Sequence, residues 1–278
     1  MNPPETSIQA EIIRSLGVSA DFDVAAELAL RTRFLADTLL HAGRRSLVLG
    51  ISGGVDSLVA GLLAQRAVKQ VRQQGHEASF IAVRLPYGVQ ADEADAAQCL
   101  QVIEPDVSLT VDIRPAADAI HSALQASGLG LGSASEEDFL LGNVKARQRM
   151  IVQYAVAGAR AGLVIGTDHA AEALMGFFTK FGDGAADVVP LSGLNKRRVR
   201  ALGQAMGAPD ALVFKTPTAD LESLQPLKPD EAAFGVSYAQ IDDFLEGRPV
   251  DAAAAAIMVA AFRQTAHKRA LPQGPGNF

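Results

Sequence analysis

The sequence lacks most of what disulfide-stabilised, dithiol redox or membrane-spanning proteins need. Its 278 residues include one cysteine, Cys99, and no tryptophan. A single cysteine cannot form an internal disulfide or a two-thiol redox pair, and its place in the helix-like run 93–103 predicts a core position. The longest apolar run, 252–262, is well short of the roughly 20 residues that span a bilayer, and the N-terminus has no hydrophobic signal segment. We therefore expect a cytoplasmic protein without a membrane partner.

Excess positive charge is also missing. The formal net charge is −6 and the pI is about 5.4, which argues against nucleic acid as a partner because no broad cationic surface is expected. No Gly-Lys pair occurs, so the lysine-bearing P-loop of common ATPases and kinases is excluded. Gly128, Gly130 and Gly132 mimic part of a dinucleotide fingerprint, but no strand precedes them and we interpret them as a loop.

Short strand-like runs alternate with helical periodicity through the middle of the chain. The expected strands are 46–51, 79–85, 108–113 and 162–165, and the expected helices lie near 57–74, 91–103, 115–127 and 137–160. This alternation predicts an α/β fold, a doubly wound parallel sheet flanked by helices, of Rossmann-like type. The length suits one domain over residues 1–278, with two helices within about 7–43 and an alanine-rich helix capped by Asp251.

The most informative segment is the glycine-rich turn from Ser52 to Ser57, which follows an apolar strand and opens a helix. Gly53 and Gly54 can take backbone angles that let successive N–H groups face one anion, and the helix N-terminus adds positive charge. Asp56 would repel a phosphate unless a cation lay between them, so it indicates Mg²⁺. An ordinary strand-to-helix connection is the alternative, but six consecutive suitable residues favour the phosphate cradle.

A second polar segment, 166–172, follows the last expected strand and should begin a helix with Thr167 or Asp168 at its cap. Asp168 and Glu172 would then share a helix face and could hold a cation or accept a proton; a cap plus a solvated face is the alternative. In a parallel sheet this segment meets the cradle at the carboxyl ends of the strands. His169 is interpreted as structural, as most lone histidines are.

Cations and glycines gather in the second half of the chain. Residues 145–149 carry three cations, and Lys180, Lys196 and the run 267–269 add others, although each could be a solvated surface charge. Glycine-rich residues 176–195 and proline-rich residues 215–231 are predicted to be mobile loops that cover the site, with passive surface loops as the alternative.

Several of these segments carry a family resemblance. Residues 52–57 resemble the pyrophosphate loop of N-type ATP pyrophosphatases. The blocks 84–93, 166–172, 176–184, 217–221 and 267–269, in this order, closely resemble ammonia-dependent NAD⁺ synthetase, from about Gly50 almost to the C-terminus. The resemblance implies an adenine nucleotide alpha-hydrolase-like fold, ATP and Mg²⁺ as co-substrate and cofactor, deamido-NAD⁺ and ammonia as substrates, and a homodimer.

The resemblance also implies roles for individual residues. ATP-binding positions are Gly50, Ile51, Ser52, Gly53, Gly54, Val55, Asp56, Ser57, Arg84, Thr167, Lys196 and Thr218. Asp56 and Glu172 would ligate Mg²⁺, while Arg147, Lys180, Asp187, His267 and Lys268 would contact deamido-NAD⁺. Lys180 is also expected to assist catalysis.

The expected reaction converts an inert carboxylate into an acyl adenylate with release of pyrophosphate, and ammonia then displaces AMP. Asp168 is our hypothesised group for binding ammonium or accepting its proton. Only 49 residues precede Gly50, too few for a fused glutaminase domain, so free ammonia is the expected nitrogen donor.

Two other classes remain open at this point. Another adenylating amidotransferase or a tRNA-thiolating relative would share the loop, and a nucleotide-binding sensor would share the fold. Thiolation usually requires further cysteines, which this sequence lacks. A sensor would bind ATP without releasing pyrophosphate, so a pyrophosphate assay separates the classes.

Overall fold

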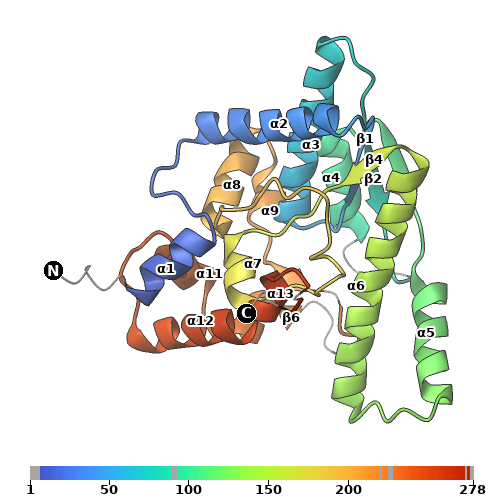
Figure 1. Ribbon diagram of the computed structural model, residues 1–278, viewed down its shortest axis with the longest axis vertical. Helices are drawn as coiled ribbons and strands as arrows, with labels where there is room; N and C mark the ends of the chain where they lie inside the picture. Colours follow the sequence, from blue (N-terminus) through green and yellow to red (C-terminus); the bar gives the residue numbers. More distant parts are fainter. Residues whose placement is uncertain (1–6, 89–92, 220, 225–227, 273, 276–278) are drawn as a thin grey trace.

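The centre of the molecule is a four-stranded parallel sheet in the order β3-β2-β1-β4 (Figure 1). The computed structural model describes residues 7–88, 93–219, 221–224, 228–272 and 274–275. The strands are β1 (Ser46–Gly50), β2 (Ser79–Arg84), β3 (Val107–Thr110) and β4 (Gly162–Val164). Each lies within or close to a run expected from the sequence, and the parallel pairing confirms the predicted sheet.

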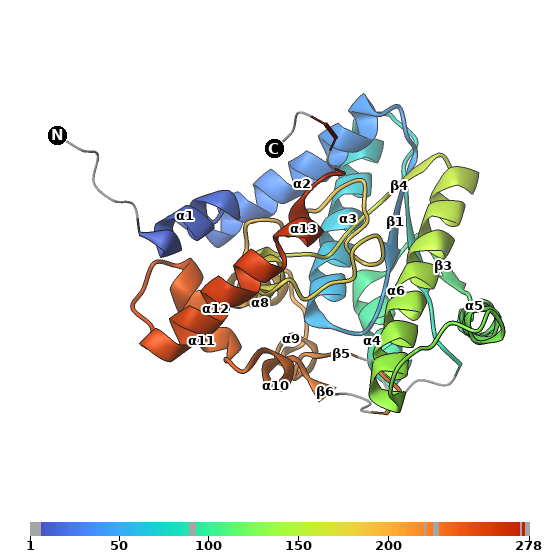
Figure 2. The same ribbon diagram turned by 60° about the horizontal axis from the view of Figure 1, so that its bottom comes forward.

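Helices cover both faces of this sheet (Figure 2). One face packs on α2 (Val24–His41), α3 (Val55–Gln73), α4 (Glu93–Ile103), α8 (Lys196–Ala205) and α9 (Asp210–Val213). The other face packs on α6 (Ala134–Ala159), and α5 (Arg114–Ala126) packs on α6. Along β1, Leu47 and Leu49 belong to the first core cluster and Val48 to the second. Because neighbouring side chains of a strand point to opposite faces, a strand buried on both sides is apolar throughout.

A further apolar cluster lies away from the sheet, among α1 (Ile8–Ser15), α7 (Ala170–Met175), α11 (Tyr238–Leu245) and α12 (Ala252–Gln264). Ile12, Leu174 and Phe244 are buried in it. The predicted cap is confirmed, since Asp251 accepts a hydrogen bond from the N–H of Ala254 at 2.8 Å. The two helices predicted within residues 7–43 are present as α1 and α2.

The two proposed covers differ in structure. Residues 176–195 form turns and extended backbone, as predicted, and Val188 makes an isolated parallel bridge with Ile165 beyond the end of β4. Residues 215–231 were expected to be a loop, but the described part contains β5 (Thr218–Ala219), paired antiparallel with β6 (Lys228–Pro229), and the start of α10 (Asp230–Phe234). Proline is tolerated in an edge strand, so the prolines do not exclude these two short strands within the segment.

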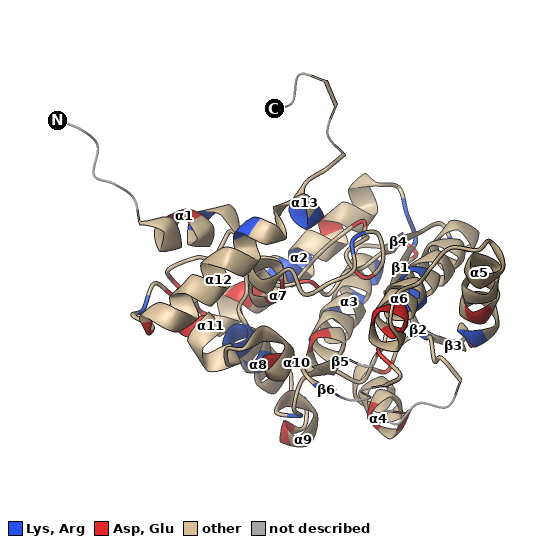
Figure 3. Ribbon diagram, turned by 90° about the horizontal axis from the view of Figure 1, so that it is seen from below, with Lys and Arg blue, Asp and Glu red and all other residues tan. Residues whose placement is uncertain are grey.

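No helix in the described part of the chain is long and apolar enough to cross a membrane. Cys99 is fully buried on α4, in agreement with its predicted core position. Acidic and basic residues are interspersed along the helices (Figure 3).

Candidate active site

The turn between β1 and α3 has a backbone shape that requires glycine. Gly53 has φ of +86°, and a Cβ at this position would lie 2.9 Å from the backbone nitrogen of Ala96. Gly54 is the N-cap of α3, and no described side chain caps the helix there. The first N–H groups of α3 therefore remain available to an anion, as the sequence predicted for a phosphate cradle.

The two serines of the cradle bind each other and the turn. Ser57 Oγ donates to the carbonyl of Gly54 at 3.0 Å, and Ser52 Oγ lies 3.2 Å from Ser57 Oγ. Ser52 Oγ also accepts a hydrogen bond from the N–H of Gly54 at 3.3 Å. These contacts hold the turn in shape before any ligand binds.

Four ionisable side chains converge beside the cradle, and we call Asp56, His169, Glu172 and Lys196 the acid–lysine cluster. Lys196 Nζ lies 2.7 Å from Asp56 Oδ2 and 3.3 Å from His169 Nε2. His169 Nε2 is 3.4 Å from Asp56 Oδ1 and 3.7 Å from Glu172 Oε2. The cluster joins α3, α7 and α8, so only the folded chain assembles it.

The pKa values of the two carboxyl groups in the cluster are shifted in opposite directions. Burial alone would raise the pKa of Asp56, but Lys196 and His169 hold it well below its usual range. Burial raises the pKa of Glu172 to about 8, and the charge of Asp56 adds to this while His169 opposes it. Burial would lower the pKa of Lys196, but Asp56 and Glu172 raise it. Asp56 and Lys196 thus form a charged pair, while Glu172 takes up a proton readily until a cation arrives.

The cluster fits a divalent metal ion. One potential ligand atom each from Asp56, His169 and Glu172 lies within 4.8 Å of the others. Asp56 Oδ1 is buried and accepts no hydrogen bond from the described residues, so it has capacity for another partner. Carboxylate oxygens are the ligands that Mg²⁺ prefers in proteins, and two of them are present.

His169 corrects the expected cap of α7. It is the N-cap of α7, through Nδ1, which accepts from the N–H of Glu172 at 3.4 Å, so neither Thr167 nor Asp168 takes the cap. The bridge between Ile165 and Val188 continues the extended backbone past β4, and the helix starts later. The imidazole of His169 also lies inside the acid–lysine cluster, a position that the sequence did not predict.

A cavity of about 420 Å³ opens over the cradle and the cluster. The residues predicted from the sequence that line it are Gly50, Ile51, Ser52, Gly54, Val55, Asp56, Ser57, Arg84, Thr167, Glu172, Lys196, Thr218 and Lys268. Among the described residues that the sequence singled out, those away from its lining are Gly53, Arg147, Asp168, Lys180, Asp187 and His267. The structure therefore gathers nearly all the predicted ATP positions and few of the predicted dinucleotide positions.

The dinucleotide positions instead bind the backbone of residues 176–195 and its neighbours. Arg147 donates to the carbonyl of Lys180 at 3.2 Å, and Lys180 Nζ donates to the carbonyl of His267. Lys268 Nζ donates to two carbonyls of the same segment at 2.9 Å each, and Asp187 accepts from the N–H of Val164 at 2.7 Å.

Asp168 lines a second cavity of about 270 Å³, next to Arg269. Burial, together with the charge of Asp183, raises the pKa of Asp168 to about 7, and its Oδ1 has no hydrogen-bond partner within the described chain. Asp183 lines the main cavity, accepts from the N–H of Thr179 at 2.9 Å, and has its pKa raised by burial. Sequence reasoning gave Asp183 no role, although its two flanking glycines were a usable signal.

Two further residues that line the cavity, Gln153 and Asp230, were given no role by the sequence. Gln153 Oε1 accepts from the N–H of Gly50 at 2.8 Å, which ties α6 to the end of β1. Asp230 is buried and accepts from the hydroxyl of Tyr238 at 2.9 Å. Nothing near Gln153 in the sequence marks it as part of a site, whereas Asp230 lies within the segment 215–231 that was predicted to cover the site.

A parallel sheet whose strand order reverses beside β1, with a phosphate cradle and acidic groups at its carboxyl edge, defines a nucleotide-binding α/β protein with the adenine nucleotide alpha-hydrolase fold. Residues 27–272 match the family described as NAD synthase. The chain belongs to this family.

Individual relatives agree with this assignment. The chain is 60% identical to the NH(3)-dependent NAD(+) synthetase of Streptomyces coelicolor, covering 98% of this chain and 99% of that protein. A solved NAD⁺ synthetase from Burkholderia pseudomallei superposes with a TM-score of 0.84 at 56% identity, covering 98% and 99% of the two chains. An NMN synthetase from Francisella tularensis superposes with a TM-score of 0.79 at 34% identity, covering 92% of this chain and all of that one.

Proposed function

We propose that this protein amidates deamido-NAD⁺ with ammonia, driven by ATP, to give NAD⁺, AMP and pyrophosphate, the last step of NAD⁺ biosynthesis. The observation that carries the proposal is the acid–lysine cluster beside an uncapped phosphate cradle. The 60% identity with an NH(3)-dependent NAD(+) synthetase over nearly the whole chain supports it.

Asp56 and Glu172 would hold Mg²⁺, which would neutralise charge between the phosphates and the carboxylates. The cradle donates N–H groups to the phosphates, and Lys196 adds a positive charge that burial keeps out of water. Both contributions grow as negative charge develops on the departing pyrophosphate, so they lower the barrier to adenylation.

In the first step, a carboxylate oxygen of deamido-NAD⁺ bonds to the α-phosphorus of ATP as the α–β phosphoanhydride bond breaks and pyrophosphate leaves. In the second step, ammonia bonds to the acyl carbon, AMP leaves, and one ammonium proton passes to a base. We assign that acceptance to Asp168, whose pKa of about 7 suits a proton acceptor. Cys99 is buried on α4 and burial raises its pKa to about 11, so we assign it no role as a nucleophile.

The dinucleotide is assigned to Arg147, Lys180, Asp187, His267 and Lys268, and Lys180 is also proposed to assist catalysis. We infer that 176–195 and the described part of 215–231 are mobile covers of a single domain, 1–278, and close over bound ligands; residues 220 and 225–227 lie outside the described residues. Closure would exchange the hydrogen bonds that Arg147 and Lys268 donate to the backbone of 176–195 for contacts with the ligand. Protease digestion of residues 176–195 should slow when both nucleotides are present, and equal rates would contradict the closure.

A homodimer is also proposed. Leu140 and Ile151 on α6 are 46% and 50% exposed, and their spacing places both on the helix face that carries Arg147. An apolar face beside a predicted dinucleotide contact supports an interface near that site. Sedimentation of the wild type and of Ile151→Glu tests it, because a dimer should dissociate in the variant. We also propose that the enzyme works in the cytoplasm.

The test of the function is an assay with ATP, Mg²⁺, ammonium and deamido-NAD⁺, each omitted in turn, with pyrophosphate and NAD⁺ measured. We expect NAD⁺ only with all four. Pyrophosphate release that does not require the dinucleotide would overturn the proposal. Replacing deamido-NAD⁺ by nicotinic acid mononucleotide tests the alternative suggested by the NMN synthetase likeness, and preference for the mononucleotide would favour that alternative.

A further inference from the structure

The first N–H groups of α8 are already occupied by a buried carboxylate from another helix. Asp242, on α11, accepts from the N–H of Lys196 at 3.0 Å through Oδ1 and from the N–H of Arg197 at 2.8 Å through Oδ2. Asn195, the N-cap, accepts from the N–H of Arg198 at 3.0 Å. Three donors that usually bind solvent or an anion at a helix N-terminus are therefore satisfied within the protein.

Asp242 is 3% exposed, and burying a carboxylate is unfavourable unless it is well bonded. Burial raises its pKa to about 6, although the two N–H donors oppose the rise. The side chain of the N-cap Asn195 satisfies only one of the free N–H groups at this helix end. Asp242 therefore supplies the acceptors for the two N–H groups that Asn195 leaves, at Lys196 and Arg197.

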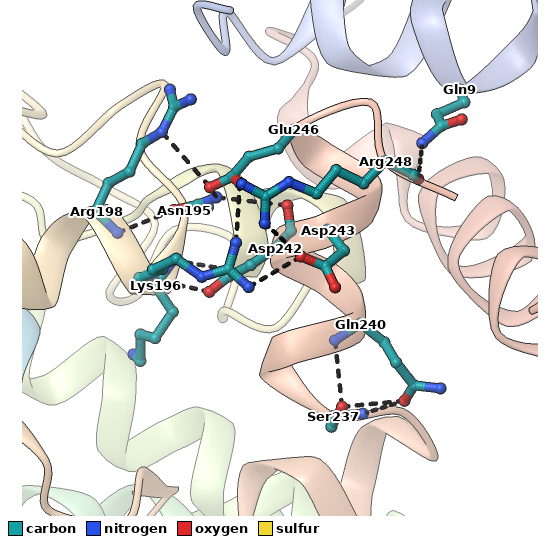
Figure 4. Close-up of polar contacts among 11 residues, drawn as sticks. Gln9, Asn195, Lys196, Arg198, Ser237, Gln240, Asp242, Asp243, Glu246 and Arg248 are labelled. Atoms are coloured by element: carbon teal, nitrogen blue, oxygen red, sulfur yellow. Dashed lines mark hydrogen bonds and ion pairs between the residues drawn. The ribbon is translucent and has the colours of Figure 1, made fainter. Parts of the chain in front are cut away.

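Other contacts join the same two helices around Asp242 (Figure 4). Glu246 accepts from the side chain of Asn195 at 2.7 Å and pairs with Arg197 at 2.9 Å. Asp243 pairs with Arg197 at 2.9 Å, but it contacts that side chain rather than the backbone of α8. Asp242 is therefore the member of this acidic group that bonds directly to the backbone of Lys196.

The side chain of Lys196 is held by α11 at its other end. Lys196 Nζ lies 4.8 Å from the ring centroid of Tyr238, the first residue of α11, and the Tyr238 hydroxyl donates to Asp230. Lys196 is 1% exposed and reaches Asp56 at 2.7 Å. One helix thus fixes both the backbone and the ammonium group of the lysine that faces the cradle.

We propose that Asp242 is a positioning residue for ATP, which acts by fixing the start of α8 so that Lys196 Nζ meets the phosphates beside Asp56. The proposal rests on the proposed function of this site. On this proposal α8 contacts the phosphates through Lys196 Nζ and not through its N-terminal N–H groups, because Asp242 and Asn195 already bind those N–H groups.

The experiment compares Asp242→Asn with Asp243→Asn, which makes the same change of charge one residue away. Steady-state pyrophosphate release is measured against ATP, deamido-NAD⁺ and ammonium at a temperature at which circular dichroism shows each variant folded. We expect kcat/KM for ATP to fall about tenfold in Asp242→Asn, as for loss of a buried charged hydrogen bond. KM for the other two substrates should stay within twofold, and Asp243→Asn should match the wild type.

A double-mutant cycle with Lys196→Met, read as the dissociation constant of Mg²⁺-ATP by calorimetry, tests whether Asp242 acts through Lys196. We expect Asp242→Asn to have no further effect in the Lys196→Met background. Full additivity, or an unchanged kcat/KM for ATP in folded Asp242→Asn, would overturn the proposal. If Asp242→Asn does not fold, Asp242→Ser, which keeps one acceptor, is measured in its place with the same criteria. Wild-type synthesis of NAD⁺ in the same assay tests the proposed function separately.

Discussion

The two ends of the proposed site are built differently. At the ATP end, Asp56, Glu172 and Lys196 are largely buried and held by side chains from several helices. At the dinucleotide end, the side chains of Arg147, Lys180 and Lys268 donate hydrogen bonds to backbone carbonyls of neighbouring segments. The first end has its geometry before ligand binds, whereas the second must exchange protein contacts for ligand contacts.

This difference indicates which step of the proposed reaction each end serves. A preformed charged site requires little rearrangement and suits the adenylation step, in which charge develops at a fixed place. The dinucleotide end, which must rearrange, suits recognition of the substrate and closure of the covers, because only the correct substrate would then complete the site. Changes at the first end should therefore reduce kcat, and changes at the second should raise KM.

The largest effect is expected from Lys196→Met. Loss of a buried positive charge beside the departing pyrophosphate should reduce kcat for pyrophosphate release by at least about 100-fold, the range found for removal of one transition-state donor. Lys69→Met, an exposed position on α3, is the control and should retain wild-type turnover. A reduction of less than fivefold in folded Lys196→Met would mean that the ATP end does not work as described.

A smaller effect is expected from Glu172→Gln, which removes one proposed Mg²⁺ ligand. The concentration of Mg²⁺ that gives half-maximal activity should rise at least about tenfold. Because the pKa of Glu172 is raised to about 8, protons compete with the metal, so wild-type affinity for Mg²⁺ should increase from pH 6.5 to pH 8.5. Titration of the protein with Mg²⁺ in the presence of an ATP analogue measures this affinity at each pH. If the affinity of Glu172→Gln for Mg²⁺ depends on pH as steeply as that of the wild type, Glu172 is not the titrating ligand.

At the dinucleotide end, Lys268→Met should raise KM for deamido-NAD⁺ roughly fivefold, with kcat and KM for ATP within twofold of the wild type. The effect is modest because Lys268 already donates to two protein carbonyls and must give these up to meet a ligand. Initial-rate measurements with each substrate varied are sufficient. A loss confined to kcat would remove the contrast between the two ends.

The smallest effect concerns stability. The folded-state pKa of Asp242 is about 6, above its ordinary value of 3.8, so the folded protein retains a proton that the unfolded chain releases between these values. Its contribution to stability is greatest below pH 4 and is lost as the pH rises through 6. The difference in thermal midpoint between wild type and Asp242→Asn should shrink over this range by a few degrees, since one pKa unit is worth about 1.4 kcal/mol. A constant difference would contradict the assignment.

Local sequence signals predicted the parallel sheet, most helix positions and the cradle, because periodicity and glycine conformations act over a few residues. The partners of the cradle could not be predicted in this way. Lys196 lies 140 residues after Asp56, and Asp242 a further 46 after Lys196, so only the tertiary fold brings them together. The position of His169 in the acid–lysine cluster was missed for the same reason, and the sequence named Lys196 only as one of several cations until the family resemblance implied a role for it.

The most direct test of the central claim, that the preformed ATP end stabilises the adenylation step, is exchange of labelled pyrophosphate into ATP without ammonium. With Mg²⁺, ATP and deamido-NAD⁺ present, the wild type should catalyse this exchange, and Lys196→Met should lose it. Absence of exchange in the wild type, under conditions in which added ammonium gives NAD⁺, would contradict the account.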